Sequence, residues 1–223
     1  MNDLIINIGP SSVSCKPYAK NLGVILDCNL NMERQIGSMC RSALYHLRNI
    51  GSVRKHLTET AAAQLIHSLV TTRIDYCNSL LVGVPDKRLN KLQRVQNIAA
   101  RILTRTQKTS HITPVLYQLH WLPIKARIMY KLLIVTYQAY HSLAPSYLCD
   151  LVTPHIPSRS LRSGDQLMLV EPRTRLKTFG DRSFSAAGPR EWNKLPQTLR
   201  SATSLLSFKT QLKTYLFKTF YNC

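Results

Sequence analysis

Acidic side chains are the first candidates for chemistry in this sequence, because carboxylates hold the two metal ions used in many phosphoryl-transfer reactions. The chain has 11 Asp and Glu residues, and no two of them are adjacent. Asp27 follows an apolar, β-branched run and is the one carboxylate placed where a metal ligand would be expected. A lone acid at the end of a strand more often forms a turn. The sequence therefore predicts no catalytic residue and no metal ligand.

The histidines and cysteines make no stronger case for catalysis. The seven histidines are isolated from one another, and the six cysteines show no CxxC spacing. GxGxxG, GxxxxGK[ST], HExxH and GxSxG motifs are absent. We therefore expect no cofactor and no zinc site. Scattered thiols, and a first stretch of 15 residues without Lys or Arg, favour an intracellular protein, nuclear or cytoplasmic, over a secreted one.

Basic residues carry the strongest chemical signal. The chain has 30 Lys and Arg residues, which give a formal net charge of +19. An excess of this size is used most often to bind nucleic acid or an anionic membrane. We favour RNA, DNA or an RNA–DNA hybrid as the partner and expect no membrane association. A basic surface without any partner is the alternative.

One predicted helix, over residues 85–105, places its charges on one side. At 3.6 residues per turn, five cations fall within roughly 80° of one another, opposite an apolar arc. No acid occurs between Asp86 and Asp150 to neutralise them. We predict phosphate contacts for this face, with an ordinary solvated helix surface as the alternative. The five cations are Lys87, Lys91, Arg94, Arg101 and Arg105.

A second basic patch is predicted on loops in the C-terminal part of the chain. Cations on helices and loops position a phosphate backbone without reading its bases, so sequence specificity should be low. This patch comprises Arg159, Arg162, Arg173, Arg175 and Lys177.

Helical periodicity must position most of these side chains. The pattern predicts helices over 32–51, closed by Gly51, from an N-cap at Thr58, over 85–105, over 124–141 and over 204–220. Two apolar runs, at 4–8 and 22–27, predict a strand pair. The fold class is therefore mainly α with a short N-terminal β ribbon, and its helical bundle is followed by a mixed, loop-rich segment.

Four regions follow from this pattern: a ribbon over 1–30, a helical region over 31–110, a buried helical region over 111–153, and a basic, loop-rich region over 154–223 that ends in an amphipathic helix. Residues 154–200 should be irregular, with a strand at 167–170 and with Phe184 and Trp192 as packing anchors. Trp121 should be buried before the apolar helix at 124–141. Further residues expected in the core are Ile36, Leu47, Leu65, Leu92, Ile102, Leu132 and Leu133.

Several runs, in order, resemble the reverse transcriptases of non-LTR retrotransposons of the LINE type, within the jockey and chicken-repeat-like branch. The run at 18–27 is similar to the YLGVxLD segment that follows the catalytic motif of that family. The resemblance covers nearly the whole chain. The runs are YAKNLGVILD (18–27), RIDYCNSLL (73–81), KLQRVQNIAAR (91–101), HWLP (120–123), APSYL (144–148), RSLRS (159–163), EWNKLP (191–196) and FKTQLKT (208–214).

The resemblance implies a location for each region within such an enzyme. The ribbon would be the end of the palm, with Leu22, Gly23 and Val24 at a primer-grip-like position, and residues of about 32–110 would form the thumb that follows the template–primer duplex. The paired aspartates of the [FY]xDD motif do not occur in this sequence. We therefore expect a fragment that binds template–primer backbones without polymerase activity, whose partners include the palm and fingers of the parent polyprotein. A degenerate remnant with a structural or protein-interaction role is the alternative.

Overall fold

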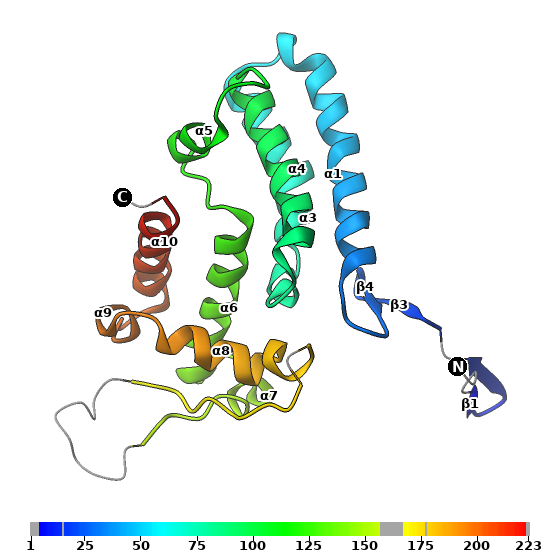
Figure 1. The fold of residues 1–223 in the computed structure, drawn as a ribbon, viewed down its shortest axis with the longest axis vertical. Coiled ribbons are helices and arrows are strands. Elements are labelled where there is room, and N and C mark those ends of the chain that lie inside the picture. Colours follow the sequence, from blue (N-terminus) through cyan, green and yellow to red (C-terminus); the bar gives the residue numbers. More distant parts are fainter. Residues whose placement is uncertain (1–4, 15, 157–166, 177, 222–223) are drawn as a thin grey trace.

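The computed structural model describes residues 5–14, 16–156, 167–176 and 178–221. Helices build most of it, and two short β-hairpins precede the first long helix (Figure 1). The predicted fold class, mainly α with a short N-terminal ribbon, is confirmed.

The ribbon consists of two local hairpins, where the sequence predicted a single strand pair. Gly9 and Gly23 adopt positive φ angles in the two-residue turns, and such turns favour pairing between consecutive strands. Val24 of the second hairpin is buried, and the Ile25 N–H donates to Gln35 Oε1 at 2.9 Å. This hairpin therefore packs on the first helix. The strands are β1 (Ile5–Ile8), β2 (Ser11–Ser14), β3 (Tyr18–Asn21) and β4 (Val24–Asp27).

The helices that follow surround a first apolar core. The predicted stop at Gly51 is wrong, because the first helix continues to Val53 and then into a 3₁₀ turn. The Thr58 cap is confirmed, since its side chain accepts from the Ala61 N–H at 3.2 Å. A π-helical turn, His67–Thr71, joins the second helix to the third. These helices are α1 (Glu33–Val53), α2 (Glu59–Ile66), α3 (Thr72–Asp75), α4 (Asp86–Thr104) and α5 (Ile112–Gln118).

Helix α6 (Ile124–Tyr140) stands between two apolar cores. Ile128 and Leu132 join the first core, whereas Leu133 and Tyr137 join the second. The prediction that this helix is buried on nearly all sides is confirmed, and the two cores are the physical reason for its apolar sequence.

The second core lies between α6 and the C-terminal helices. Trp192 at its centre is fully buried, as predicted, and Phe184 is half-buried between the two cores. The expectation that 154–200 is irregular is wrong in part, because two helices form there. The expected strand at 167–170 reduces to one isolated bridge between Pro154 and Leu169. The helices of this part are α7 (Ser146–Cys149), α8 (Phe184–Asn193), α9 (Gln197–Arg200) and α10 (Leu205–Tyr221).

Most of the predicted core residues are buried, and two are only partly so. Leu65 lies at the edge of the face that α2 buries through Ala62 and Ile66. Ile102 lies beside Gly51, which has no side chain to cover it. The remaining predictions are confirmed for Ile36, Leu47, Leu92, Trp121, Leu132 and Leu133.

Candidate nucleic-acid interface

Helix α4 is amphipathic in the way its sequence predicts. Pro85 precedes its first turn, where a missing N–H costs nothing, and the helix ends one residue before Arg105, which adopts a left-handed conformation. Leu92, Val95 and Ala99 are buried against the other helices of the first core. The charged face therefore points away from that core.

The five predicted cations of α4 differ in their surroundings. Lys87 and Arg94 are exposed, and neither makes a hydrogen bond or ion pair within the described residues. Lys91 is also exposed, but its Nζ lies 3.5 Å from Glu33 Oε1 of α1. The positive charge at Lys91 is therefore partly compensated before any ligand binds.

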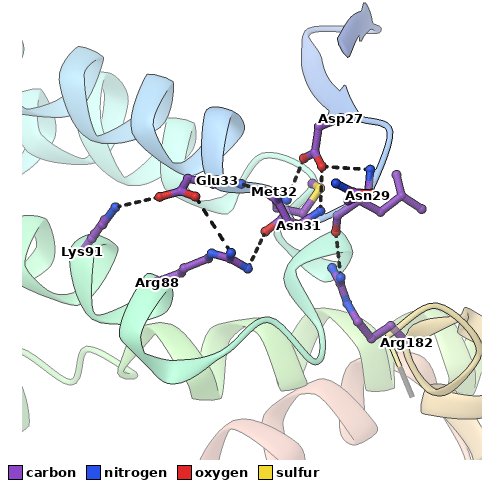
Figure 2. A network of polar contacts seen from close by, with 9 residues as sticks. Asp27, Asn29, Asn31, Met32, Glu33, Arg88, Lys91 and Arg182 are labelled. Atoms are coloured by element: carbon purple, nitrogen blue, oxygen red, sulfur yellow. Dashed lines mark hydrogen bonds and ion pairs between the residues drawn. The ribbon is translucent and has the colours of Figure 1, made fainter. Parts of the chain in front are cut away.

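The polar network around Glu33 joins α4 to the start of α1 (Figure 2). Arg88, a cation outside the predicted set, lies 3.9 Å from Glu33 Oε2 and donates to the Asn31 carbonyl at 3.4 Å. Asp27 accepts the N–H groups of Asn29, Asn31 and Met32 at 3.0 to 3.2 Å. Asp27 is therefore a turn former, as favoured from the sequence, and its carboxylate oxygens are committed to the backbone.

At the other end of α4, Arg101 and Arg105 donate hydrogen bonds to backbone carbonyls. Arg101 donates to the Gln107 and Ser110 carbonyls at 3.4 and 3.0 Å, and Arg105 donates to the Arg54 carbonyl at 3.3 Å. Bonds to neutral carbonyls leave both positive charges uncompensated. Arg101 is half-buried, whereas Arg105 is exposed.

These two arginines border an open cleft of about 330 Å³ between the ends of α1 and α4. Lys108 lines the same cleft, and Ile98 and Ile102 supply its apolar part. Sequence reasoning missed Lys108 because it lies beyond the helix, where the 3.6-residue period no longer applies. The cleft combines cationic side chains, Arg101, Arg105 and Lys108 among them, with an apolar floor.

Arg54, which also lines this cleft, has a structural role. It is buried, and it donates to the carbonyls of Leu57, Ile102 and Leu103 at 2.7 to 3.0 Å. Its guanidinium thus satisfies carbonyls at the C-terminus of α4, where a cation is favoured by the helix dipole.

Helix α1, which packs beside α4, carries a further row of exposed arginines. The two helices run parallel, since Glu33 meets Lys91 near their starts and Gly51 meets Ile102 near their ends (Figure 1). Arg34, Arg41 and Arg48 are exposed on α1, and Arg34 stacks over the Tyr18 ring at 4.3 Å. The sequence showed their seven-residue spacing, but only the packing places their helix next to α4.

The second predicted patch can be located only in part. Arg173 and Arg175 are exposed in the irregular segment before α8, without a hydrogen bond or ion pair in the described part of the chain. Arg159, Arg162 and Lys177 lie outside the described residues. Whether these five cations gather stays a prediction.

The primer-grip-like residues form the tight turn of the second hairpin. Leu22 and Gly23 both have positive φ angles, of 45° and 85°. Leu22 is 84% exposed, and its carbonyl accepts from the Tyr76 hydroxyl at 2.6 Å. Val24, in contrast, is buried in the first core. The turn is thus braced from α3's C-terminal end and presents Leu22 outward.

Neither a metal cluster nor a reactive thiol stands out in the described residues. They contain no group of three or more His, Cys, Asp or Glu side chains that could hold a metal ion. Burial raises the pKa of the Cys40 thiol, and nearby Lys91 only partly opposes this. Among the described helices, none combines the length and the apolar character that crossing a membrane requires.

These features define a helical bundle with a basic outer surface on α1 and α4. Comparison of the chain with protein-family models, with curated proteins and with solved structures found no match in any of the three.

Proposed function

We propose that this chain binds the phosphate backbone of RNA, DNA or an RNA–DNA hybrid, without sequence preference, through the outer surface of α4 and the cleft at its C-terminal end. The observation that carries the proposal is the group of uncompensated cations there. Lys87 and Arg94 have no partner among the described residues, and Arg101, Arg105 and Lys108 border one cleft. Cations in this arrangement release counterions when they meet phosphates.

We further propose that the chain is the C-terminal part of a non-LTR retrotransposon reverse transcriptase and is not an enzyme by itself. The ordered runs of similarity support this origin, and so does the helical region after a β-hairpin whose turn is Leu22–Gly23. We further propose an intracellular location, nuclear or cytoplasmic, where such nucleic acids occur.

The test is binding of a fluorescent RNA–DNA duplex, followed by anisotropy over a range of salt concentrations. About five phosphate contacts predict a slope of log K against log salt of roughly −4 to −5. Arg94→Glu should weaken binding by about tenfold or more and reduce the slope's magnitude by one to two, because it replaces a phosphate-binding cation with an anion.

Lys218→Glu on α10 is the matched control, since Lys218 is exposed and lies on a different helix. It changes net charge by the same amount and should weaken binding far less. Equal losses in the two variants would mean that net charge alone drives binding, and the proposed surface would be abandoned.

A role in protein interaction is the second candidate, and one observation favours it. An apolar cleft of about 310 Å³ lies between β4, the segment before α4 and the start of α8. Leu30, Leu80 and Phe179 on its lining are exposed. Salt-independent association of the chain with a protein, lost on Leu80→Asp and retained on Arg94→Glu, would support this second candidate.

A further inference from the structure

A separate cleft, of about 390 Å³, lies among α3, α6, α10 and the segment before α6. None of its lining residues belongs to the proposed nucleic-acid surface. Its volume falls within the range of sites that enclose small molecules. The residues that carry the argument are Asp75, Asn78, Trp121, Tyr130, Lys131 and Lys213.

The charges in this cleft favour an anionic group. Its carboxylate, Asp75, is already paired, because Arg127 Nη1 lies 2.8 Å from Asp75 Oδ2. Arg127 also donates to the Leu122 carbonyl at 2.9 Å. Lys131 and Lys213, from α6 and α10, are exposed and have no hydrogen bond or ion pair within the described residues. Two ammonium groups from different helices therefore share one cleft without a counter-charge.

The walls of the cleft favour a flat ring. Trp121 and Leu122 are largely buried and contribute their remaining surface to the lining. The His67 ring meets the Trp121 ring edge-on, with centroids 5.7 Å apart. The Tyr130 hydroxyl is protonated near neutral pH, as tyrosine ordinarily is, and burial raises its pKa further, so it can donate a hydrogen bond. Aromatic side chains of this kind are common partners of nucleobases.

Asn78 adds a buried hydrogen-bond acceptor that receives no donor from the described residues. The residue is 3% exposed, and its Nδ2 donates to Asp75 Oδ1 at 3.3 Å. No donor reaches Asn78 Oδ1 within the described part of the chain. A buried acceptor without a donor is unfavourable, and a ligand N–H placed there would remove the deficit.

We propose that this cleft binds a nucleoside monophosphate, with the phosphate between Lys131 and Lys213, the base against Trp121 and Tyr130, and a base N–H directed to Asn78. Every common nucleobase except thymine and uracil carries an exocyclic amino group, and those two carry a ring N–H. Each base can therefore donate to Asn78, and the cleft should bind nucleoside monophosphates as a class without preferring one base. The nucleotide can come free from solution or as the 5′-phosphorylated end of a strand.

Isothermal titration of the full chain tests the proposal with four probes: adenosine 5′-monophosphate, adenosine, ribose 5-phosphate and inorganic phosphate. The monophosphate should bind at least about tenfold more tightly than each of the other three, because only it offers both the phosphate and the base. Equal binding of the monophosphate and inorganic phosphate, or no binding of the monophosphate, would overturn the proposal.

Three variants then assign the contacts. Lys131→Glu and Lys213→Glu should each reduce affinity for the monophosphate by about tenfold or more, whereas Lys218→Glu, on the same helix as Lys213 but outside the cleft, should leave it unchanged. Asn78→Leu should weaken binding of the monophosphate but not binding of ribose 5-phosphate. Circular dichroism checks that the variant is folded. Equal losses for the three charge reversals would reduce the effect to net charge and overturn the site.

Binding of oligonucleotides with and without a 5′-phosphate shows whether the ligand is a strand end or a free nucleotide. A preference for the phosphorylated end that Lys131→Glu removes would assign the cleft to strand ends, and its absence would assign it to free nucleotides. Arg94→Glu serves as the cross-control. It should weaken duplex binding and leave monophosphate binding unchanged, so the two proposals can fail independently.

Discussion

At the scale of single residues, the five cations predicted along α4 and at its C-cap have three different kinds of surroundings. Lys87 and Arg94 are free among the described residues, Lys91 shares its charge with Glu33, and Arg101 and Arg105 bind neutral carbonyls. Only the contact between Lys91 and Glu33 removes positive potential from the surface. Because both partners are about half exposed, that pair contributes little to stability and can exchange for a phosphate.

Glu33→Gln should therefore strengthen duplex binding. Removing one negative charge about 8 Å from a phosphate in water raises affinity about twofold to threefold. Glu59→Gln is the control, since Glu59 occupies the same first-turn position in α2 and forms no ion pair within the described residues. Anisotropy at low salt checks this, and an unchanged affinity for Glu33→Gln would show that Lys91 does not contact the nucleic acid.

Tyr221 should make the folding stability of the protein fall with increasing pH in the alkaline range. Its hydroxyl donates to the Trp121 carbonyl at 2.6 Å, and burial raises its pKa to about 12 from an ordinary value of 10.0. A raised pKa means that folding favours the protonated form, so this stabilisation is complete below pH 10 and is lost as the pH rises from about 10 to 12. In urea unfolding, Tyr221→Phe should show a shallower loss of stability over that range. Parallel curves for the two proteins would contradict it.

At the scale of elements, helix α8 shows how packing overrides a sequence signal. Gly188–Pro189 reads as a break, because proline lacks an N–H and clashes with the preceding turn. The helix nevertheless continues through Pro189 to Asn193. Gly188 is buried against Thr136 of α6, and a Cβ added at Gly188 would lie 2.9 Å from Thr136 Oγ1. The close approach of α8 to α6 therefore requires glycine at this position.

Gly188→Ala should destabilise the protein by about 1–3 kcal/mol, because the new methyl group overpacks the contact with Thr136. Gly37→Ala in α1 is the matched control, since a Cβ there meets nothing within 4 Å. That substitution should stabilise the protein by about 0.5–1 kcal/mol through helix propensity. Urea unfolding measures both changes, and equal effects of the two substitutions would refute the packing argument.

At the scale of the whole molecule, two apolar cores meet on α6, and the sequence has only 11 acidic residues against 30 basic ones. Three of these acids have structural contacts. Asp27 accepts backbone N–H groups in a turn, Asp75 forms a partly buried ion pair with Arg127, and Glu33 at the start of α1 pairs with Lys91. The described residues contain no group of three or more His, Cys, Asp or Glu side chains that could hold a metal ion.

The purified chain should therefore bind a primer–template without extending it when deoxynucleotides and Mg²⁺ or Mn²⁺ are supplied. The physical reason is that two-metal phosphoryl transfer needs neighbouring carboxylates to hold the ions. A gel-based extension assay against a mock preparation is the measurement. Extension above the mock level would contradict the proposed non-enzymatic role.

The sequence by itself determined the features that repeat locally. The 3.6-residue period of α4 placed Leu92 and Arg94 on opposite faces, and the apolar run of α6 indicated a buried helix. Thr58 indicated a helix start. These patterns are visible in the sequence because they involve neighbours within one or two turns. Tertiary structure alone decided which distant residues meet. Lys91 pairs with Glu33 across 58 positions, and Lys131 and Lys213 reach one cleft from α6 and α10. Those pairings depend on how helices pack, which no local period encodes.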